Sequence, residues 1–196
     1  MDLKGKKIGF GLTGSHCTYE AVFPQMEKLV ELGAELVPVV SYTFKDTDSK
    51  FGKADDHMAR VREITGRDPI TSIVDAEPLG PVEPLDIMVL APLTGNSMSR
   101  LANAITDGPV LMATKATIRN GNPIVIGVST NDALGLNGVN LMRLMSTKLI
   151  YFVPFGQDDP IKKPNSMVSD MTLIPETVKN ALEYKQIQPV VIERNK

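Results

Sequence analysis

Residues 87–91 form an unbroken apolar run near the middle of the chain. A run of this length without a polar residue is typical of a strand that is buried on both faces of a parallel sheet. Pro92 ends the run, and residues 93–97 bring hydroxyl, amide and glycine groups before a helical pattern begins at Met98. A strand whose carboxyl end opens into polar groups at the start of a helix is suited to hold a polar ligand.

The same order of a strand followed by a helix recurs along the chain. Apolar runs predict further strands at 6–12, 36–40, 70–74, 124–128 and 149–153. Helical periodicity predicts helices at 18–32, 57–65, 98–105, 110–120 and 136–146, and a last one that starts near Pro175. Residues 75–84, which contain three prolines, and residues 155–165 are predicted to be loops. The alternation predicts an α/β protein with a doubly wound parallel sheet of about six strands.

Composition excludes several classes of function. The net charge is −2 and the acids and bases are interspersed, so the sequence predicts no nucleic-acid or membrane surface. The longest apolar runs are too short to span a membrane. One cysteine, Cys17, excludes an internal disulfide, and two histidines without metal-ligand spacing argue against a metal site. We expect one domain, residues 1–196, in the reducing cytoplasm.

Four polar loops leave the carboxyl ends of predicted strands. In an open α/β sheet these ends line one crevice, which is deepest where the strand order reverses. If the strands at 6–12 and 87–91 are neighbours, the loops that follow them face each other. Hydroxyl groups at a helix N-terminus suit a phosphate dianion, and an amide suits a flat heterocycle with alternating carbonyl and N–H groups. The four loops are residues 13–15, 41–43, 92–97 and 129–131.

Each loop also has a simpler explanation. A Gly-Ser pair after a strand is common turn chemistry, and Thr94 or Asn96 can cap the following helix. For any one loop taken alone, this structural interpretation is the favoured one. Four such loops at one edge of a sheet favour binding.

A dinucleotide interpretation of the first loop is weak. Gly9, Gly11 and Gly14 match the spacing G-x-G-x-x-G, which carries little information by itself. The motif needs an acid about 20 residues further on, at the end of the second strand, to bind a ribose diol. Ser41 and Thr43 stand there instead, so the sequence favours a mononucleotide.

Residues 12–15 and 91–107 together resemble a family of flavoproteins, the homo-oligomeric flavin-containing cysteine decarboxylases. The P-A-S-A-N-T motif of that family is matched by residues 92–97, and its A-N-G-I-x-D helix by residues 102–107. The resemblance covers residues 5–155. It implies a three-layer, Rossmann-like sheet with strand order 3-2-1-4-5-6, numbered along the chain, and FMN at the point where the order reverses. It also implies trimer-based homo-oligomers with the flavin near a subunit interface.

The resemblance implies roles for individual positions. Thr13, Gly14 and Ser15 correspond to the phosphate loop, and Ser41 and Thr43 to hydroxyls after the second strand. The positions that meet the flavin are Pro92, Thr94, Asn96 and Ser97. The loop after the fifth strand corresponds to Ser129, Thr130 and Asn131, and residues 155–165 lie where the decarboxylases have a mobile substrate clamp.

Two departures argue against decarboxylation of a cysteine peptide. The histidine that the family carries before its fourth strand has no counterpart in residues 75–84. Of the P-x-M-N-x-x-M motif after the fifth strand, the chain keeps only an asparagine, Asn131. No catalytic residue is therefore assigned from the sequence.

The resemblance instead implies one component of a two-component oxidoreductase. It would act with a second, different subunit during bacterial sporulation and oxidise a dihydropyridine dicarboxylate to the aromatic pyridine dicarboxylate. The flavin would accept a hydride, and the second subunit would contribute a nicotinamide site for NAD(P). Two alternatives are kept: a flavin-dependent decarboxylase or prenyl-FMN-forming transferase, and a cofactor-free structural partner of the second subunit.

A few further residues carry predictions of their own. His57 lies in a polar helical pattern and is predicted to be a solvated surface residue. Cys17 is predicted to be a small buried thiol, and Met142 and Met145 to be core packing. The lysines at 162–163 are predicted to be a solvated pair, which near the mouth of a site would attract a dicarboxylate.

Overall fold

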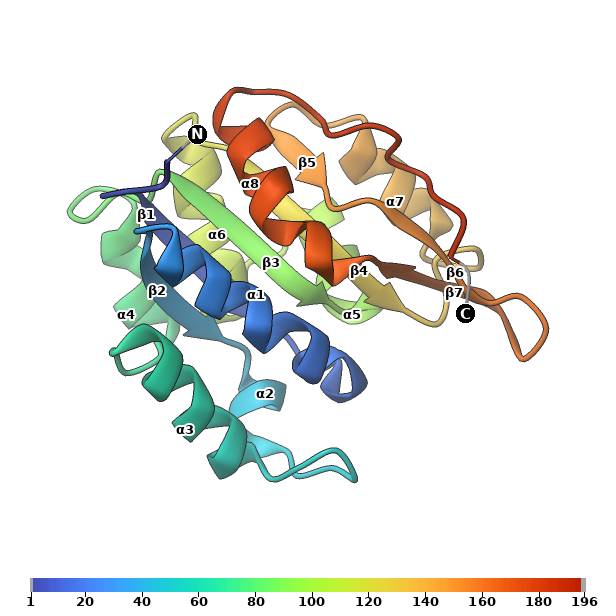
Figure 1. The fold of residues 1–196 in the computed structure, drawn as a ribbon, viewed down its shortest axis with the longest axis horizontal. Helices are drawn as coiled ribbons and strands as arrows, with labels where there is room; N and C mark the ends of the chain where they lie inside the picture. Colours follow the sequence, from blue (N-terminus) through green and yellow to red (C-terminus); the bar gives the residue numbers. More distant parts are fainter. Residues whose placement is uncertain (1, 195–196) are drawn as a thin grey trace.

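The computed structural model describes residues 2–194, and its centre is a seven-stranded sheet (Figure 1). Along its main path the strands are β2 (Glu35–Val40), β1 (Lys7–Leu12), β3 (Ile87–Leu93), β4 (Ile124–Thr130), β7 (Lys163–Ser169) and β6 (Phe155–Asp159). A further strand, β5 (Ile150–Phe152), pairs with β4. The strands from β1 to β5 pair in parallel, whereas β7 is antiparallel to β4 and to β6.

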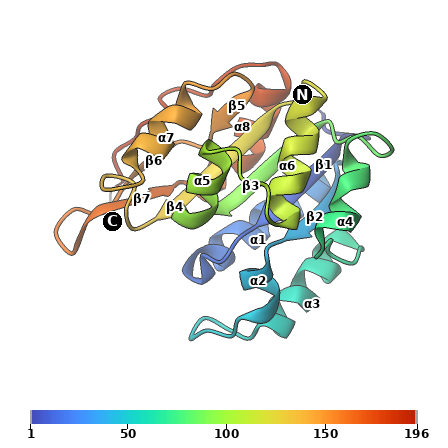
Figure 2. The ribbon, with the colours of Figure 1, turned by 180° about the vertical axis from the view of Figure 1, so that it is seen from behind.

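Helices cover both faces of the sheet and give three layers. One face carries α1 (Tyr19–Glu31), α3 (Ala54–Thr65) and α8 (Ile174–Leu182), which lie in front of the sheet in Figure 1. The other face carries α4 (Ile73–Ala76), α5 (Gly95–Ala102), α6 (Pro109–Arg119) and α7 (Gly138–Met145), which lie in front in Figure 2. The short elements are α2 (Tyr42–Asp46), η1 (His16–Thr18), η2 (Glu77–Leu79) and η3 (Met171–Leu173).

The apolar runs become central strands because they are buried on both faces. Every residue of β3 and β4 is buried, and alternate residues enter two separate core clusters. Phe10 and Val89 pack under α1 and α8, whereas Leu90 and Ile126 pack under α6 and α7. This double-sided burial is what the unbroken run at 87–91 predicts, so the predicted α/β fold is confirmed.

Gly9 and Gly11 of β1 make room for side chains of the neighbouring strand. A Cβ built on Gly9 would lie 2.5 Å from the sulfur of Met88, and one on Gly11 would lie 2.9 Å from Leu90 Cδ2. Both glycines are therefore explained by packing within the sheet. The G-x-G spacing needs no dinucleotide to account for it.

The predicted strand at 70–74 is wrong. Ile70 makes a single parallel bridge to Val39 beside β2, and the chain then turns into α4. The reason is a cap: the Ser72 hydroxyl accepts a hydrogen bond from the backbone N–H of Asp75 and so starts a helix. For the remaining strands the predicted order 2-1-4-5-6 is confirmed, since β2, β1, β3, β4 and β5 are neighbours in that order.

The predicted loop at 155–165 is also wrong in part. It forms β6 and the start of β7, joined by a turn in which Asp159 Oδ1 accepts from the backbone N–H groups of Ile161 and Lys162. β7 pairs with the carboxyl half of β4, where Ser129 lies opposite Val168. Ser129 and Thr130 therefore end a paired strand and do not lie in a free loop.

His57 is buried, contrary to prediction. Its side chain is 6% exposed and packs on the aromatic rings of Tyr19, Phe23 and Phe44, with a ring-centre distance of 4.9 Å to Tyr19. Its Nε2 atom is buried without a hydrogen-bond partner among the described residues. Burial raises the pKa of Tyr19 well above its usual range, and burial followed by the charge of His57 lowers the pKa of His16.

Two further sequence predictions are corrected. Cys17, in the short η1 helix, is exposed. Met145 packs against the core as predicted, but Met142 is 56% exposed. Val139 of α7 and Leu136, just before the helix, are exposed with it, at 65% and 91%, so α7 and the turn before it present apolar side chains to the outside.

Candidate functional site

Thr13 joins the carboxyl ends of β1 and β3. Its hydroxyl donates to the carbonyl oxygen of Pro92 at 2.6 Å and accepts from the backbone N–H of Thr94 at 3.0 Å. The carbonyl oxygen of Thr13 accepts from the Tyr19 hydroxyl at 2.9 Å. Thr13 is 1% exposed, so its side chain fixes the two turns against each other and does not reach a ligand. The predicted neighbourhood of the first and third polar loops is therefore confirmed.

A cavity of about 220 Å³, here called the first cavity, lies between these turns and the end of β2. A Cβ built on Gly14 would lie 2.5 Å from Thr43 Cγ2, so the absence of a side chain at residue 14 lets Thr43 pack directly against the turn after β1. Hydroxyl groups and an amide lie in the wall beside apolar side chains from the start of α6. The lining residues are Gly14, Ser41, Tyr42, Thr43, Thr94, Asn96, Ser97, Arg100, Asp107, Gly108, Pro109, Val110 and Leu111.

Helix N-termini converge on the first cavity. The first residues of α2, α5 and α6 all lie at or beside its lining. Ser41 caps α2 by accepting from the N–H of Phe44, and Thr94 caps α5 by accepting from the N–H of Ser97. Each helix directs the positive end of its dipole toward the cavity, which favours an anion there.

One ion pair lies in the wall of the first cavity. The guanidinium of Arg100 lies 3.3 Å from a carboxylate oxygen of Asp107, and both side chains are partly exposed. The sequence analysis assigned neither residue to the site. Both belong to the family-like stretch, and Arg100 lies a little more than one turn after Asn96 on α5, which is the signal that would have found it.

The start of α5 packs closely against the end of β4 and the turn that follows it. A Cβ built on Gly95 would lie 2.5 Å from Thr130 Oγ1 and 2.7 Å from Asp132 Oδ1. The Asp132 carboxylate accepts hydrogen bonds from the hydroxyl of Thr130 and from the side-chain amide of Asn137, at 2.5 and 2.7 Å. Glycine at residue 95 therefore lets the start of the helix approach the end of β4 closely.

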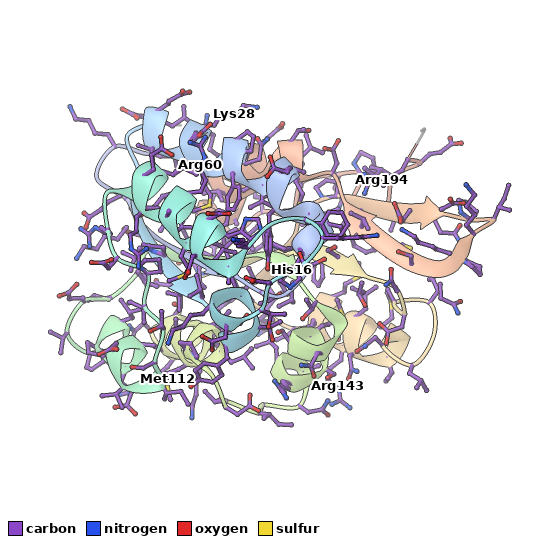
Figure 3. All side chains as sticks on the ribbon, turned by 90° about the horizontal axis from the view of Figure 1, so that it is seen from below. His16, Lys28, Arg60, Met112, Arg143 and Arg194 are labelled. Carbon is purple, nitrogen blue, oxygen red and sulfur yellow. The ribbon has the colours of Figure 1, made fainter. Side chains whose placement is uncertain are left out.

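A second, larger cavity of about 480 Å³ lies on the other side of the β1–α1 turn. Three hydroxyl groups meet in its wall: Ser15 Oγ lies 2.7 Å from Ser129 Oγ, which lies 2.8 Å from Thr18 Oγ1. In Figure 3, His16 of this turn lies between the two helix layers. The lining residues are Ser15, Cys17, Thr18, Ala21, Ser129, Thr130, Asn131, Asp158, Lys163, Ser166, Val168, Ser169, Asp170, Met171, Thr172 and Arg194.

The structure thus divides the predicted site residues between two places. Gly14, Ser41, Thr43, Thr94, Asn96 and Ser97 line the first cavity. Ser15, Ser129, Thr130 and Asn131 line the second. Thr13 and Pro92 connect the strand ends between them.

A family model described as Flavoprotein matches residues 1–173 of the chain. The chain belongs to the flavoprotein family. A curated relative, the B subunit of dipicolinate synthase from Bacillus subtilis (strain 168), is 66% identical over 191 residues, which are 97% of this chain and 96% of the relative.

Solved structures agree with this membership. The crystal structure of the B subunit of dipicolinate synthase from Bacillus halodurans C is 59% identical, has a TM-score of 0.92 and is covered at 100% in both chains. The FMN-dependent cysteine decarboxylase SpaF is 17% identical, with a TM-score of 0.66 over 93% of this chain and 98% of that one, which shows a shared fold. Among residues 2–194 of this flavoprotein, no helix is both long and apolar enough to cross a membrane.

The first cavity of this flavoprotein fits the phosphate end of a flavin mononucleotide. Gly14 lines the cavity without a side chain, so a phosphate could approach the backbone of this turn closely. The helix N-termini supply positive potential, and Asn96 and Ser97 supply donors and acceptors at the rim. The residues of the first cavity are therefore compatible with the cofactor that gives the family its name.

Proposed function

We propose that this flavoprotein is the FMN-binding subunit of a dipicolinate synthase. It would act with the A subunit of dipicolinate synthase to oxidise a dihydrodipicolinate-type precursor to dipicolinic acid in the cytoplasm of a sporulating bacterium. The observation that carries the flavin assignment is the first cavity, where helix N-termini and hydroxyls meet at the family motif. The named relative, similar along nearly its whole length, supports the reaction.

The residues of the chain would bind and orient the cofactor. The N-termini of α5 and α6 would hold the phosphate near Gly14 and Thr43, and the amide of Asn96 would bind polar edges of the flavin. FMN, when bound, supplies a two-electron acceptor for the dihydropyridine ring, which loses a hydride and a proton as it becomes aromatic. The A subunit would contribute a site for NAD(P), to which the two electrons pass.

A homo-oligomer would complete the flavin site. The first cavity, at about 220 Å³, lies below the roughly 300–1,000 Å³ that small-molecule sites usually offer, so the flavin ring would extend beyond it. Val139 and Met142 of α7, together with Leu136 just before the helix, are exposed apolar side chains, and α7 packs beside α5. Exposed apolar patches of this kind mark protein interfaces. We therefore propose trimer-based assembly, with light scattering of the purified protein as its test.

Titration with FMN tests the cofactor assignment. Binding should perturb the visible absorbance of the flavin with a dissociation constant in the micromolar range or below. Asn96→Ala should weaken binding about tenfold, because a polar group then faces the ligand unpaired. Asn180→Ala on α8, a half-buried asparagine on the opposite face of the sheet, is the matched control and should bind like the native chain. No spectral change at tens of micromolar would contradict the proposal.

One observation favours a second candidate, a cofactor-free partner that stabilises the A subunit. The hydroxyls of Ser41 and Thr94 already accept hydrogen bonds from backbone N–H groups as helix caps. The activity of the A subunit, measured in isolation and in the mixture, separates the two candidates: equal rates favour the structural partner. Turnover of a carboxylate or a prenyl phosphate by this chain alone would instead indicate a decarboxylase or a prenyl-FMN-forming transferase.

A further inference from the structure

The second cavity contains two cationic side chains from distant parts of the chain. Lys163 comes from the start of β7, and Arg194 comes from the C-terminal segment that follows α8. Figure 3 shows Arg194 beside the β6–β7 hairpin. Neither residue belongs to a motif that the sequence analysis used for the flavin.

The C-terminal segment is held in place by β6. The backbone N–H of Phe155 donates to the carbonyl oxygen of Val190, and the N–H of Ile192 donates to the carbonyl oxygen of Phe155, both at 3.0 Å. A Cβ built on Gly156 would overlap the carbonyl oxygen of Ile192 and lie 3.1 Å from Arg194 Cγ. Glycine at residue 156 therefore permits the contact that brings Arg194 to the cavity.

Among residues 2–194, the guanidinium of Arg194 makes one hydrogen bond. One of its terminal nitrogens donates to the carbonyl oxygen of Ser169 at 3.2 Å. Arginine has five N–H donors in a fixed plane, so within this part of the chain the bond orients the group and leaves other donors for a ligand. Its planar fork matches a carboxylate with two parallel hydrogen bonds.

Two acids also line the second cavity, and each has a partner within the chain. Asp158 lies 3.0 Å from the ammonium of Lys163, and the hydrogen bond from the lysine to this carboxylate raises the pKa of the lysine. Asp170 accepts from the backbone N–H and the hydroxyl of Thr172. Lys163 therefore stays charged, and an ammonium with three donors can hold a second carboxylate beside Asp158.

The rest of the wall suits a polar, flat molecule. The hydroxyls of Ser15, Thr18 and Ser129 form a connected group, each able to donate or accept. The two cavities lie on opposite sides of the β1–α1 turn, since Gly14 lines the first and the next residue, Ser15, lines the second. A ring bound in the second cavity would therefore lie across this turn from a flavin bound in the first.

We propose that the second cavity binds the substrate, a small ring dicarboxylate, with Arg194 and Lys163 each binding a carboxylate group. The inference rests on the proposed function, since that function identifies the substrate as a dicarboxylate. It assigns recognition of the substrate to residues of β7 and the C-terminal segment, outside the flavin motifs. The three connected hydroxyls of Ser15, Thr18 and Ser129 position the ring.

Isothermal titration of the full chain tests the proposal, with pyridine-2,6-dicarboxylate as a stable probe and pyridine-2-carboxylate as its single-carboxylate counterpart. The native chain should bind the dicarboxylate at least about tenfold more tightly, because two charge-assisted contacts replace one. Arg194→Met and Lys163→Met should each weaken the dicarboxylate about tenfold or more and abolish most of this preference. Equal binding by either variant and the native chain would overturn the proposal.

Two further variants show whether a loss of dicarboxylate affinity comes from the second cavity or from the net charge of the protein. Lys162→Met removes an exposed neighbouring charge that does not line the cavity, and it should leave the affinity unchanged. Gly156→Val should displace the C-terminal segment and weaken the dicarboxylate as Arg194→Met does, although the arginine is still present. If Lys162→Met weakens binding equally, the effect is one of net charge and the proposal fails.

Failure of this inference can be distinguished from failure of the proposed function. FMN binding, followed by visible absorbance, depends on the first cavity and should be the same in Arg194→Met and in the native chain. A chain that binds FMN but shows no dicarboxylate preference overturns this inference alone. A chain that binds the dicarboxylate through Arg194 and does not bind FMN overturns the flavin assignment and retains the second cavity as an anion site.

Discussion

Gly14 and Thr43 lie so close together in the wall of the first cavity that a methyl group on the glycine would overlap the threonine methyl, at 2.5 Å. Carbon atoms that are not bonded normally stay more than about 3.5 Å apart. The pair therefore joins two parts of the wall, the turn after β1 and α2. A side chain at residue 14 would push these two parts away from each other.

Gly14→Ala is expected to weaken FMN binding about tenfold, since its methyl group would push the two walls apart or enter the space of the phosphate. Thr43→Ser removes the opposing methyl and keeps the hydroxyl, so the double variant Gly14→Ala/Thr43→Ser should recover part of the affinity. Visible absorbance titration measures all three variants. An unchanged affinity in Gly14→Ala would contradict the assignment of the cavity.

Thr13→Val should destabilise the protein by about 1–3 kcal/mol, because the carbonyl oxygen of Pro92 and the N–H of Thr94 lose their buried partner. Valine has nearly the shape of threonine, so packing is preserved. Thr13→Ser keeps the hydroxyl and should cost less than Thr13→Val. Urea unfolding gives the free energy of unfolding for each variant, and equal midpoints for valine and threonine at this position would refute the bridging role.

Asp107→Asn should tighten FMN binding a few-fold, because Arg100 loses its intramolecular partner at the wall of the first cavity. The gain should appear with FMN and be absent with riboflavin, which has no phosphate. It should also shrink as salt is added, since the pair is partly exposed. Equal gains for both flavins would show that the phosphate does not lie near Arg100.

Acid should destabilise the native chain partly through His16. Burial and the charge of His57 hold the pKa of His16 below its usual 6.5, so the unfolded chain binds a proton at a higher pH than the folded one. This contribution to stability is complete above about pH 7 and is lost as the pH falls through the folded pKa. His16→Gln should make the melting temperature depend less steeply on pH between pH 7 and pH 5. Parallel curves for the two proteins would rule out the effect.

The sequence predicted the strand ends well because the relevant information is local. An apolar run followed by hydroxyls and glycine marks a buried strand and its turn, and residues 87–97 fulfil both parts. The meeting of Thr13 with Pro92 follows from the strand order. The strand order itself came from the family resemblance.

A local helix cap and tertiary contacts decided the predictions that failed. At 70–74 the apolar pattern predicted a strand, but the cap at Ser72 starts a helix after one bridge. His57 lies among polar neighbours in sequence, yet α1 and α2 bring Tyr19 and Phe44 onto its ring. Arg194 reaches the second cavity only because β6 binds the C-terminal segment, a pairing with no local signature.

The two cavities draw on different lengths of chain. The first takes all its lining from residues 14–111, whereas the second also requires residues 158–194. Sequence variation after residue 111 can therefore alter the lining of the second cavity without changing any lining residue of the first.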